Sequence, residues 1–588
     1  ILCVVSPQNW SFLKTYTGLR QNLFNRLTPI IVAELGAGAF DTPLYDFSFL
    51  LTITERTNPT SKMAYTSVVT SEFKGPQEKA KALREEGVNT LSFNRVLNMP
   101  DMRLLTKFVD TKGPLSDWCD VFCGIQTGDN ERFVRKFWEM AKKLEHWEYY
   151  QRTTDSSVYY GGMEQLLYWE DGSGEMSKLP GFRDRLSADL ENALIERRIG
   201  FVVHRMGRLP CTIAHARLFD QNGAILVPKD IKYASSIWKF ITSPEYYKVV
   251  RSLDNKVGVT PKTLAMPSFN CSNDSDDQDG RLPQPYSDDP TQWIFHGHPA
   301  RSEQTLQVAV ARLLGYRWPA ELDAGMELSA EARALINKSQ DLLTHADKDG
   351  IVCIPAVGGE APAAERLLNL LAAAYGEDWS NDLLSELLAQ ADHAGKSLET
   401  WLRDKFFVQH CQLFHHRPFI WQIWDGLRDG FSALVNYHHL DRKNLETLIY
   451  SYLGDWITRQ KEELRSGVDG AGEKLAAAEN LKKKLELILE GEATYDIFVR
   501  WKSLAEQPIG WQPDLNDGVR LNIRPFISVP DVGKKGAGCL RDKPNIKWGK
   551  DRGKDVESSP WYHLFKGDRI NDHHLTLAEK SEGRENHK

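Results

Sequence analysis

Arginine and histidine side chains that could bind phosphate or bases crowd one short segment of the sequence, residues 196–217. It holds five arginines and two histidines: Arg197, Arg198, Arg205, Arg208, Arg217, His204 and His215. Guanidinium groups bind phosphates and can donate two parallel hydrogen bonds to guanine, so these residue types suit contact with DNA. Arg205 and Arg208 lie in the densest part and are candidate DNA-binding residues. A solvent-exposed strand face with the same charges is the alternative, and the sequence leaves both open.

A second basic segment lies near the C-terminus and is rich in glycine. Its basic residues are Lys534, Lys535, Arg541, Lys543, Lys547, Lys550, Arg552 and Lys554, and one tryptophan stands among them. Basic residues interleaved with glycine and an aromatic ring suit contacts with a nucleic-acid backbone. Lys543 and Lys547 are therefore further DNA-binding candidates, and a flexible solvated tail is the alternative. Gly536 and Gly538 are not followed by Lys and Ser or Thr at the spacing of a phosphate-binding loop.

The overall composition limits what these segments can do. The chain has 588 residues and a formal net charge of -7, so any surface that attracts nucleic acid must be local. That length allows three or four domains. No run approaches the ~18 apolar residues that cross a bilayer, so we expect no membrane partner. Eight scattered cysteines do not form a disulfide scaffold and indicate a cytoplasmic protein.

Two groups of residues are of types that can bind a metal ion. For both groups, metal binding is the less favoured interpretation. Three residues separate Cys119 from Cys123, and no second pair of ligands stands nearby, so zinc is not favoured. An aromatic segment carries five histidines, which are His410, His415, His416, His438 and His439. We expect these histidines to be buried beside aromatic rings, so no metal ligand is predicted.

The elements that must position the candidate residues begin at the first residue. Residues 1–5 form an apolar strand, residues 12–27 repeat apolar side chains at helical spacing, and a second strand starts at Ile30. A glycine-rich turn, GAGAF, and a third strand, YDFSFLLTIT, follow. This order predicts an α/β fold, the end of a doubly wound Rossmann-like sheet, in which ligands bind beyond the carboxyl ends of the strands.

The sequence VVSPQNW, then a helix, then ELGAGAFDTPLYDFSFLLTI, resembles the closing half of the catalytic domain of adenine-specific DNA methyltransferases. The similar enzymes belong to type II restriction–modification systems and to BREX- or DISARM-like phage-defence systems. The resemblance implies transfer of a methyl group from S-adenosylmethionine to the amino group of an adenine flipped out of double-stranded DNA. It also implies other defence-system subunits as possible partners.

The family's cofactor-binding glycine loop and its Asn-Pro-Pro-aromatic motif do not occur in the 588 residues. We therefore expect a C-terminal fragment that is inactive alone, with S-adenosylmethionine bound by a missing N-terminal part. A non-catalytic DNA-recognition subunit that partners a separate catalytic chain is the alternative function. A nuclease is least favoured, because no carboxylate–carboxylate–lysine cluster stands on a predicted strand.

The resemblance also assigns roles to individual residues. By residue match, Phe40 of GAGAF is the aromatic ring that stacks on the flipped base, and a simple core position is the alternative. The turn GIQTGDN, residues 124–130, is similar to a DNA-facing turn at the start of the family's target recognition domain. This implies DNA contacts for Thr127, Asn130 and Arg132. A tight turn with nothing bound is the alternative.

These patterns together predict the domain organisation. We expect residues 1–95 to be the C-terminal half of the catalytic domain and residues 116–270 to be an α+β target recognition domain. An acidic, proline-bearing linker at 271–292 follows. The remainder is a mainly α C-terminal region, divided into a helical domain (293–400), an aromatic-rich and coiled helical region (401–510) and a basic Gly-rich tail (511–588).

Overall fold

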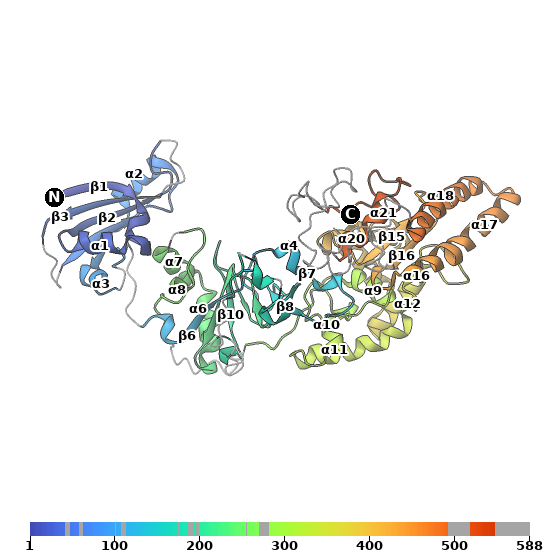
Figure 1. Ribbon diagram of the computed structural model, residues 1–588, viewed down its shortest axis with the longest axis horizontal. Helices are drawn as coiled ribbons and strands as arrows, with labels where there is room; N and C mark the ends of the chain where they lie inside the picture. The colour runs from blue at the N-terminus through green and yellow to red at the C-terminus, as the bar shows by residue number, and fades with distance from the viewer. Residues whose placement is uncertain are drawn as a thin grey trace, which may run out of the picture.

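The computed structural model describes most of the chain and places its parts along one long axis (Figure 1). The described residues are 1–41, 48–57, 63–99, 102–106, 113–174, 176–179, 181–184, 190, 192–194, 199–254, 256–269, 282–491 and 518–546. The candidate Lys547 and the side chain of Arg132 lie outside them. Within the described part, no helix is both long enough and apolar enough to cross a membrane.

The N-terminal part is a five-stranded mixed sheet in the order β1-β3-β2-β4-β5. Its elements are β1 (Leu2–Pro7), α1 (Thr17–Phe24), β2 (Thr28–Gly36), β3 (Phe49–Glu55), β4 (Ala64–Val69), α2 (Gly75–Glu85), β5 (Asn89–Ser92) and α3 (Phe93–Asn98). β2 and β4 are parallel, and β3 runs antiparallel between β1 and β2. The predicted succession of strand, helix, strand and strand along the chain is thus found, whereas the position of β3 in the sheet was not predicted. The Rossmann-like arrangement of a larger sheet remains a prediction.

The middle part contains two four-stranded sheets. The first has the order β11-β10-β13-β6, with β6 (Cys119–Cys123), β10 (Phe201–His204), β11 (Cys211–Ile213) and β13 (Gly223–Pro228). The second has the order β12-β8-β9-β7, with β7 (Val134–Lys136), β8 (Trp147–Gln151), β9 (Gln165–Tyr168) and β12 (Leu218–Phe219). The helices are α4 (Asn130–Phe133), α6 (Ala234–Ile241), α7 (Pro244–Leu253) and α8 (Pro261–Leu264).

The C-terminal part surrounds a small sheet, β14-β16-β15, with helices. The strands are β14 (Ile351–Cys353), β15 (Ile420–Trp424) and β16 (Ser432–Asn436). The helices are α9 (Thr305–Leu313), α10 (Pro319–Leu322), α11 (Ala330–Asp341), α12 (Ala363–Tyr375), α13 (Asn381–Gln390), α14 (Leu398–Asp404), α15 (Phe406–Leu413), α16 (Arg442–Glu446), α17 (Leu453–Arg465), α18 (Ala471–Glu490), α20 (Val519–Asn522) and α21 (Arg524–Ser528). The antiparallel pair α17 and α18 confirms the coiled helical hairpin, and Lys461 and Glu479 pair across it at 3.2 Å.

The core of the C-terminal part continues into the middle part. One hydrophobic cluster includes Trp138 and Trp147 of the middle part together with Trp293 and Trp421. Hydrogen bonds cross the same boundary, because the Trp138 indole donates to the carbonyl of Arg417 at 3.1 Å. The second middle sheet is therefore packed rigidly against the helical region.

Two segments that the sequence predicted to be loosely held are packed against the rest of the protein. Residues 282–292 are not a loose linker, because the Trp318 indole donates to the carbonyl of Pro290 at 2.8 Å and the backbone N–H of Met163 donates to the Gln292 side chain at 2.8 Å. Residues 518–546 of the expected tail also fold, with Cys539 and Leu540 fully buried. Polar and proline-rich segments can be held this way, since their carbonyls satisfy donors of buried aromatic side chains.

Candidate nucleic-acid interface

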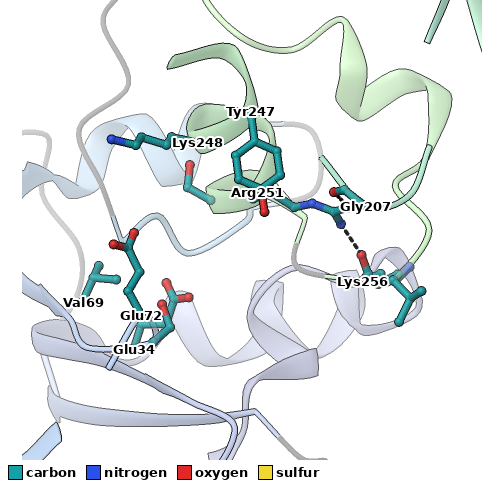
Figure 2. Close-up of a pocket in the computed structure, with 11 residues that line it drawn as sticks. Glu34, Val69, Glu72, Gly207, Tyr247, Lys248, Arg251 and Lys256 are labelled. Atoms are coloured by element: carbon teal, nitrogen blue, oxygen red, sulfur yellow. Dashed lines mark hydrogen bonds between the residues drawn. The ribbon is translucent and has the colours of Figure 1, made fainter. Parts of the chain in front are cut away.

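A cleft of about 530 Å³ lies between the N-terminal sheet and helix α7 (Figure 2). Glu34 and Glu72 stand on the side of the sheet, and Lys248 and Arg251 of α7 stand opposite (Figure 2). Lys256 lies on a loop at the rim. The cleft thus has one acidic and one basic wall, and the basic wall is the side that can hold an anion.

The acidic wall is built at the carboxyl ends of two parallel strands. Glu34 near the end of β2 is buried and accepts a hydrogen bond from the Thr106 hydroxyl at 2.6 Å. The turn after β4 packs closely against the end of β2, because a Cβ on Gly36, whose φ is +69°, would lie 2.8 Å from the Cα of Ser71. Burial lowers the pKa of Lys79, whose ammonium donates to the carbonyls of Leu35 at 2.7 Å and Thr70 at 3.0 Å. The strand ends therefore form a fixed wall, in the place where open α/β sheets bind ligands.

The basic wall is helix α7, which is wedged between two hydrophobic cores. The Ser243 hydroxyl caps its N-terminus by accepting the backbone N–H of Tyr246 at 3.1 Å, and proline occupies the first turn. Tyr246 and Val250 are buried in the core of the middle part, whereas Leu253 is buried in the core of the N-terminal part. Two faces of the helix are thus buried in these cores. The remaining face lines the cleft with Tyr247, Lys248 and Arg251.

Arg251 also fixes the rim of the cleft. Its guanidinium donates to the carbonyl of Gly207 at 2.7 Å and to the carbonyl of Lys256 at 2.5 Å. These bonds hold the 205–208 loop and the 256–259 loop together, as the dashed line in Figure 2 shows for one of them. Arg208 and Lys256 are exposed on these loops, so their side chains extend from backbone that Arg251 holds in place.

The charge around this wall is opposite in sign to that of the chain. Residues 199–262 contain ten Lys and Arg but only four Asp and Glu, an excess of six positive charges, against -7 for the whole protein. The excess is local, as a phosphate-binding surface on an acidic protein requires.

The two predicted arginines have different surroundings. Arg205 is partly buried, and its guanidinium donates to the carbonyls of Val259 at 2.8 Å and Gln221 at 3.1 Å. Arg208 is exposed three residues further on. Arg205 therefore joins three loops at the rim, and Arg208 is the one of the two placed to meet a ligand.

This difference predicts separate effects for the two alanine variants. Arg205→Ala removes a donor from two carbonyls and is expected to lower the free energy of unfolding by about 1–2 kcal/mol. Arg208→Ala should leave stability unchanged, but it should weaken binding of every duplex and flatten the salt dependence by about one phosphate contact. Urea denaturation and duplex binding over a salt series measure the two effects. Loss of stability in Arg208→Ala, or none in Arg205→Ala, would contradict these roles.

The predicted turn at 124–130 lies against the same loops. The backbone N–H of Ile125 donates to the carbonyl of Phe219 at 2.7 Å, and that of Gln221 donates to the carbonyl of Ile125 at 3.0 Å. Thr127 is buried, and its hydroxyl donates to the Asn130 side chain at 2.7 Å, while Asn130 itself is exposed. The structure thus brings the turn and the Arg205 loop together through residues 219–222. Thr127 positions Asn130 within the turn.

Other predicted residues lie elsewhere. Phe40 is 40% exposed beyond the end of β2, with its ring 5.2 Å from that of Phe49 at an interplanar angle of 85°, and it does not line the cleft. Lys543 is exposed in the C-terminal part, which the middle sheets separate from α7 along the long axis (Figure 1). One continuous surface patch therefore does not contain all the candidates.

Sequence reasoning missed the cleft residues Tyr247, Lys248, Arg251 and Lys256. Their signal was a capped helix, SPEYYKVVRSL, with three polar or basic side chains between apolar positions. Any exposed helix face shows such a pattern. Only the packing of α7 against two cores turns that face into a cleft wall.

The histidines of the aromatic segment bond to separate partners. His410 is buried between Gln307 Oε1 at 3.2 Å and the backbone N–H of Ile420 at 3.2 Å, and burial lowers its pKa to about 3. His438 instead meets the carbonyl of Trp138 at 3.0 Å. Across the residues that the structure describes, no group of three or more His, Cys, Asp and Glu side chains could hold a metal ion.

No family model matches the chain, and neither does any curated protein. Two solved structures of restriction–modification enzymes are similar to parts of it. The type IIL enzyme MmeI in complex with DNA has a TM-score of 0.26 at 10% identity, covering 63% of this chain and 48% of that chain. The ATP-dependent type ISP enzyme LlaBIII bound to DNA has a TM-score of 0.22 at 9% identity, covering 60% of this chain and 26% of that chain. The chain spans about half or less of either enzyme, and TM-scores this low do not assign a fold or an activity.

Proposed function

We propose that this chain belongs to a site-specific, adenine-specific DNA methyltransferase of a restriction or phage-defence system and that it holds duplex DNA at the basic wall of the cleft. The observation that carries the DNA-binding part is the excess of six positive charges in residues 199–262 of an acidic protein. From that segment, Lys248 and Lys256 line the cleft at the strand ends of the N-terminal sheet, and Arg208 is exposed next to the lining residue Gly207.

The methyl-transfer part of the proposal rests on the resemblance of residues 1–55 to the family. The 588 residues lack the glycine loop and the Asn-Pro-Pro-aromatic motif, so they do not fit S-adenosylmethionine. We assign cofactor binding and methyl transfer to polypeptide beyond these residues, on the same chain or on another. β1 supports a further neighbour, since Leu2, Val4 and Val5 of this edge strand are apolar and exposed. A recognition subunit that completes a separate catalytic chain is consistent with the same observation.

Phe40 tests the methyltransferase assignment. In the complete enzyme, Phe40→Ala is expected to slow single-turnover methylation by the loss of one stacking contact, roughly 1–3 kcal/mol, while cofactor affinity stays unchanged. Leu19→Ala, which also shortens an exposed apolar side chain of the N-terminal part, serves as the control. Equal methylation rates for Phe40→Ala and the control would remove Phe40 from the base-binding site.

A further inference from the structure

Three arginines of the C-terminal part converge on one carboxylate. Arg403 binds Asp404 through two hydrogen bonds, Nε to Oδ1 at 3.2 Å and Nη2 to Oδ2 at 3.1 Å. Arg541 adds a third bond, Nη2 to Oδ1 at 3.2 Å, and Nη2 of Arg428 lies 3.6 Å from Oδ2. Asp429 is the second carboxylate, 3.6 Å from Arg403. Glu399 also acts on Arg403 electrostatically, so the carboxylates balance the charge of the cluster, and Arg428 has the longest contact to Asp404 and the largest exposure.

The cluster is held rigidly. The Arg541 guanidinium lies 4.1 Å from the centre of the Trp424 ring, and its Nε donates to the carbonyl of Arg403 at 3.0 Å. This fixes the planar group in one orientation, so little side-chain entropy remains to be lost when an anion binds.

The turn that carries Arg428 is fixed as well. The Asp425 carboxylate accepts the backbone N–H groups of Leu427 at 3.0 Å and Phe431 at 2.8 Å. A Cβ on Gly426, whose φ is +95°, would overlap the carbonyl of Val532, so the turn packs directly on the glycine-rich loop that precedes Arg541. Arg428 itself is 70% exposed at the tip.

Some of the neighbouring lysines form ion pairs with carboxylates, and others are exposed with no such pair among the ion pairs of the described residues. Lys405 pairs with Asp392 at 3.1 Å, and Lys534 pairs with Asp542. Lys535 and Lys543, on the loop that packs against the arginine turn, are exposed. Arg428 and these two lysines therefore present exposed positive charge on this surface.

We propose that Arg403, Arg428 and Arg541 form a phosphate-binding site in the C-terminal part that contacts the backbone of the same duplex as the cleft. The proposal rests on the proposed DNA-binding function and adds a second contact region to it. Guanidinium groups held in a fixed fork match the oxygens of a phosphate, and each phosphate bound releases counterions. Arg403 and Arg541 provide the fixed base of the site, and Arg428 provides its exposed donor.

The test compares Arg428→Ala with Arg459→Ala, which removes an equally charged, 52% exposed arginine from α17. Binding of a duplex of about 40 base pairs, some four helical turns, is measured over a salt series. Arg428→Ala is expected to lower the slope of log affinity against log salt by about 0.9, the value for one phosphate, and Arg459→Ala to leave it unchanged. Arg428→Lys should retain the slope, because it keeps the charge.

Equal slopes for Arg428→Ala, Arg459→Ala and wild type would overturn the inference. An equal loss of affinity for polyglutamate and for the duplex would also overturn it, in favour of an acidic protein partner. The cleft is tested separately by Lys248→Glu with Lys256→Glu. If only the cleft variant loses duplex binding, the proposed arginine site is rejected and the proposed function is retained. If only Arg428→Ala loses duplex binding, the cleft is rejected as the DNA-binding surface and the arginine site is retained.

Discussion

Replacing Lys248 and Lys256 together by glutamate is expected to reduce the affinity for duplex DNA on the order of 100-fold at low salt. Both side chains line the basic wall of the cleft and belong to residues 199–262, which carry the local excess of positive charge. The change removes two candidate phosphate contacts and puts two carboxylates near phosphates, so the slope of log affinity against log salt should fall by about 1.8. The loss should be equal for cognate and unrelated sequences, because phosphate contacts carry no sequence information.

The matched control is Lys461→Glu with Lys482→Glu on the α17–α18 hairpin. These lysines are 48% and 35% exposed, and the substitution changes the net charge by the same amount. Fluorescence anisotropy with a labelled duplex measures both pairs. If the hairpin pair weakens binding as much as the cleft pair, total charge and not the cleft determines binding.

Gly124→Ala is expected to lower the free energy of unfolding by about 3 kcal/mol, at the upper end for an overpacked site. A Cβ at this position would overlap the backbone of Phe219 and Asp220, which cannot rotate away as a side chain can. Asp220 is itself fixed, since its carboxylate accepts the backbone N–H of Asn222 at 3.1 Å and pairs with Arg152 at 3.3 Å. Urea denaturation followed by tryptophan fluorescence measures the loss.

Gly258→Ala is the control in the same part of the chain. The nearest atom to its added Cβ is the Met206 Cγ at 4.0 Å, and its φ is not in the left-handed region, so stability should stay within about 0.5 kcal/mol of wild type. A Gly124→Ala protein as stable as this control would show that the 124–130 turn does not pack against residues 219–222.

Local patterns predicted the parts of the fold that local forces determine. The first strands and the α17–α18 hairpin follow from apolar spacing and from the glycines of GVDGAG between the two helices. The basic segment at 197–217 was visible from residue type alone. The surroundings of its residues were not, because Arg205 donates to the backbone carbonyls of Val259 and Gln221, and its contact with DNA stays a prediction.

Contacts between residues far apart in the sequence account for the features of the fold and of the cleft that the sequence did not predict. The cleft exists because α7 packs against two cores, one of which comes from residues more than a hundred positions earlier, such as Phe93. The 282–292 segment and the folded part of the tail are polar and proline- or glycine-rich, so composition indicated loose chain. Each is held by buried partners, such as Trp318 for Pro290, that no local pattern could identify.

The most direct test of the account is photo-crosslinking between the cleft and DNA. Val257 is 81% exposed on the rim next to Lys256, and Leu464 is 48% exposed at the hairpin between α17 and α18. A photoreactive phenylalanine analogue at position 257 is predicted to crosslink to bound duplex DNA, and the same analogue at position 464 is predicted not to. Crosslinking should disappear in the Lys248→Glu, Lys256→Glu background. DNA that binds the protein but crosslinks from position 464 and not from position 257 would contradict the central claim that the duplex lies at this cleft.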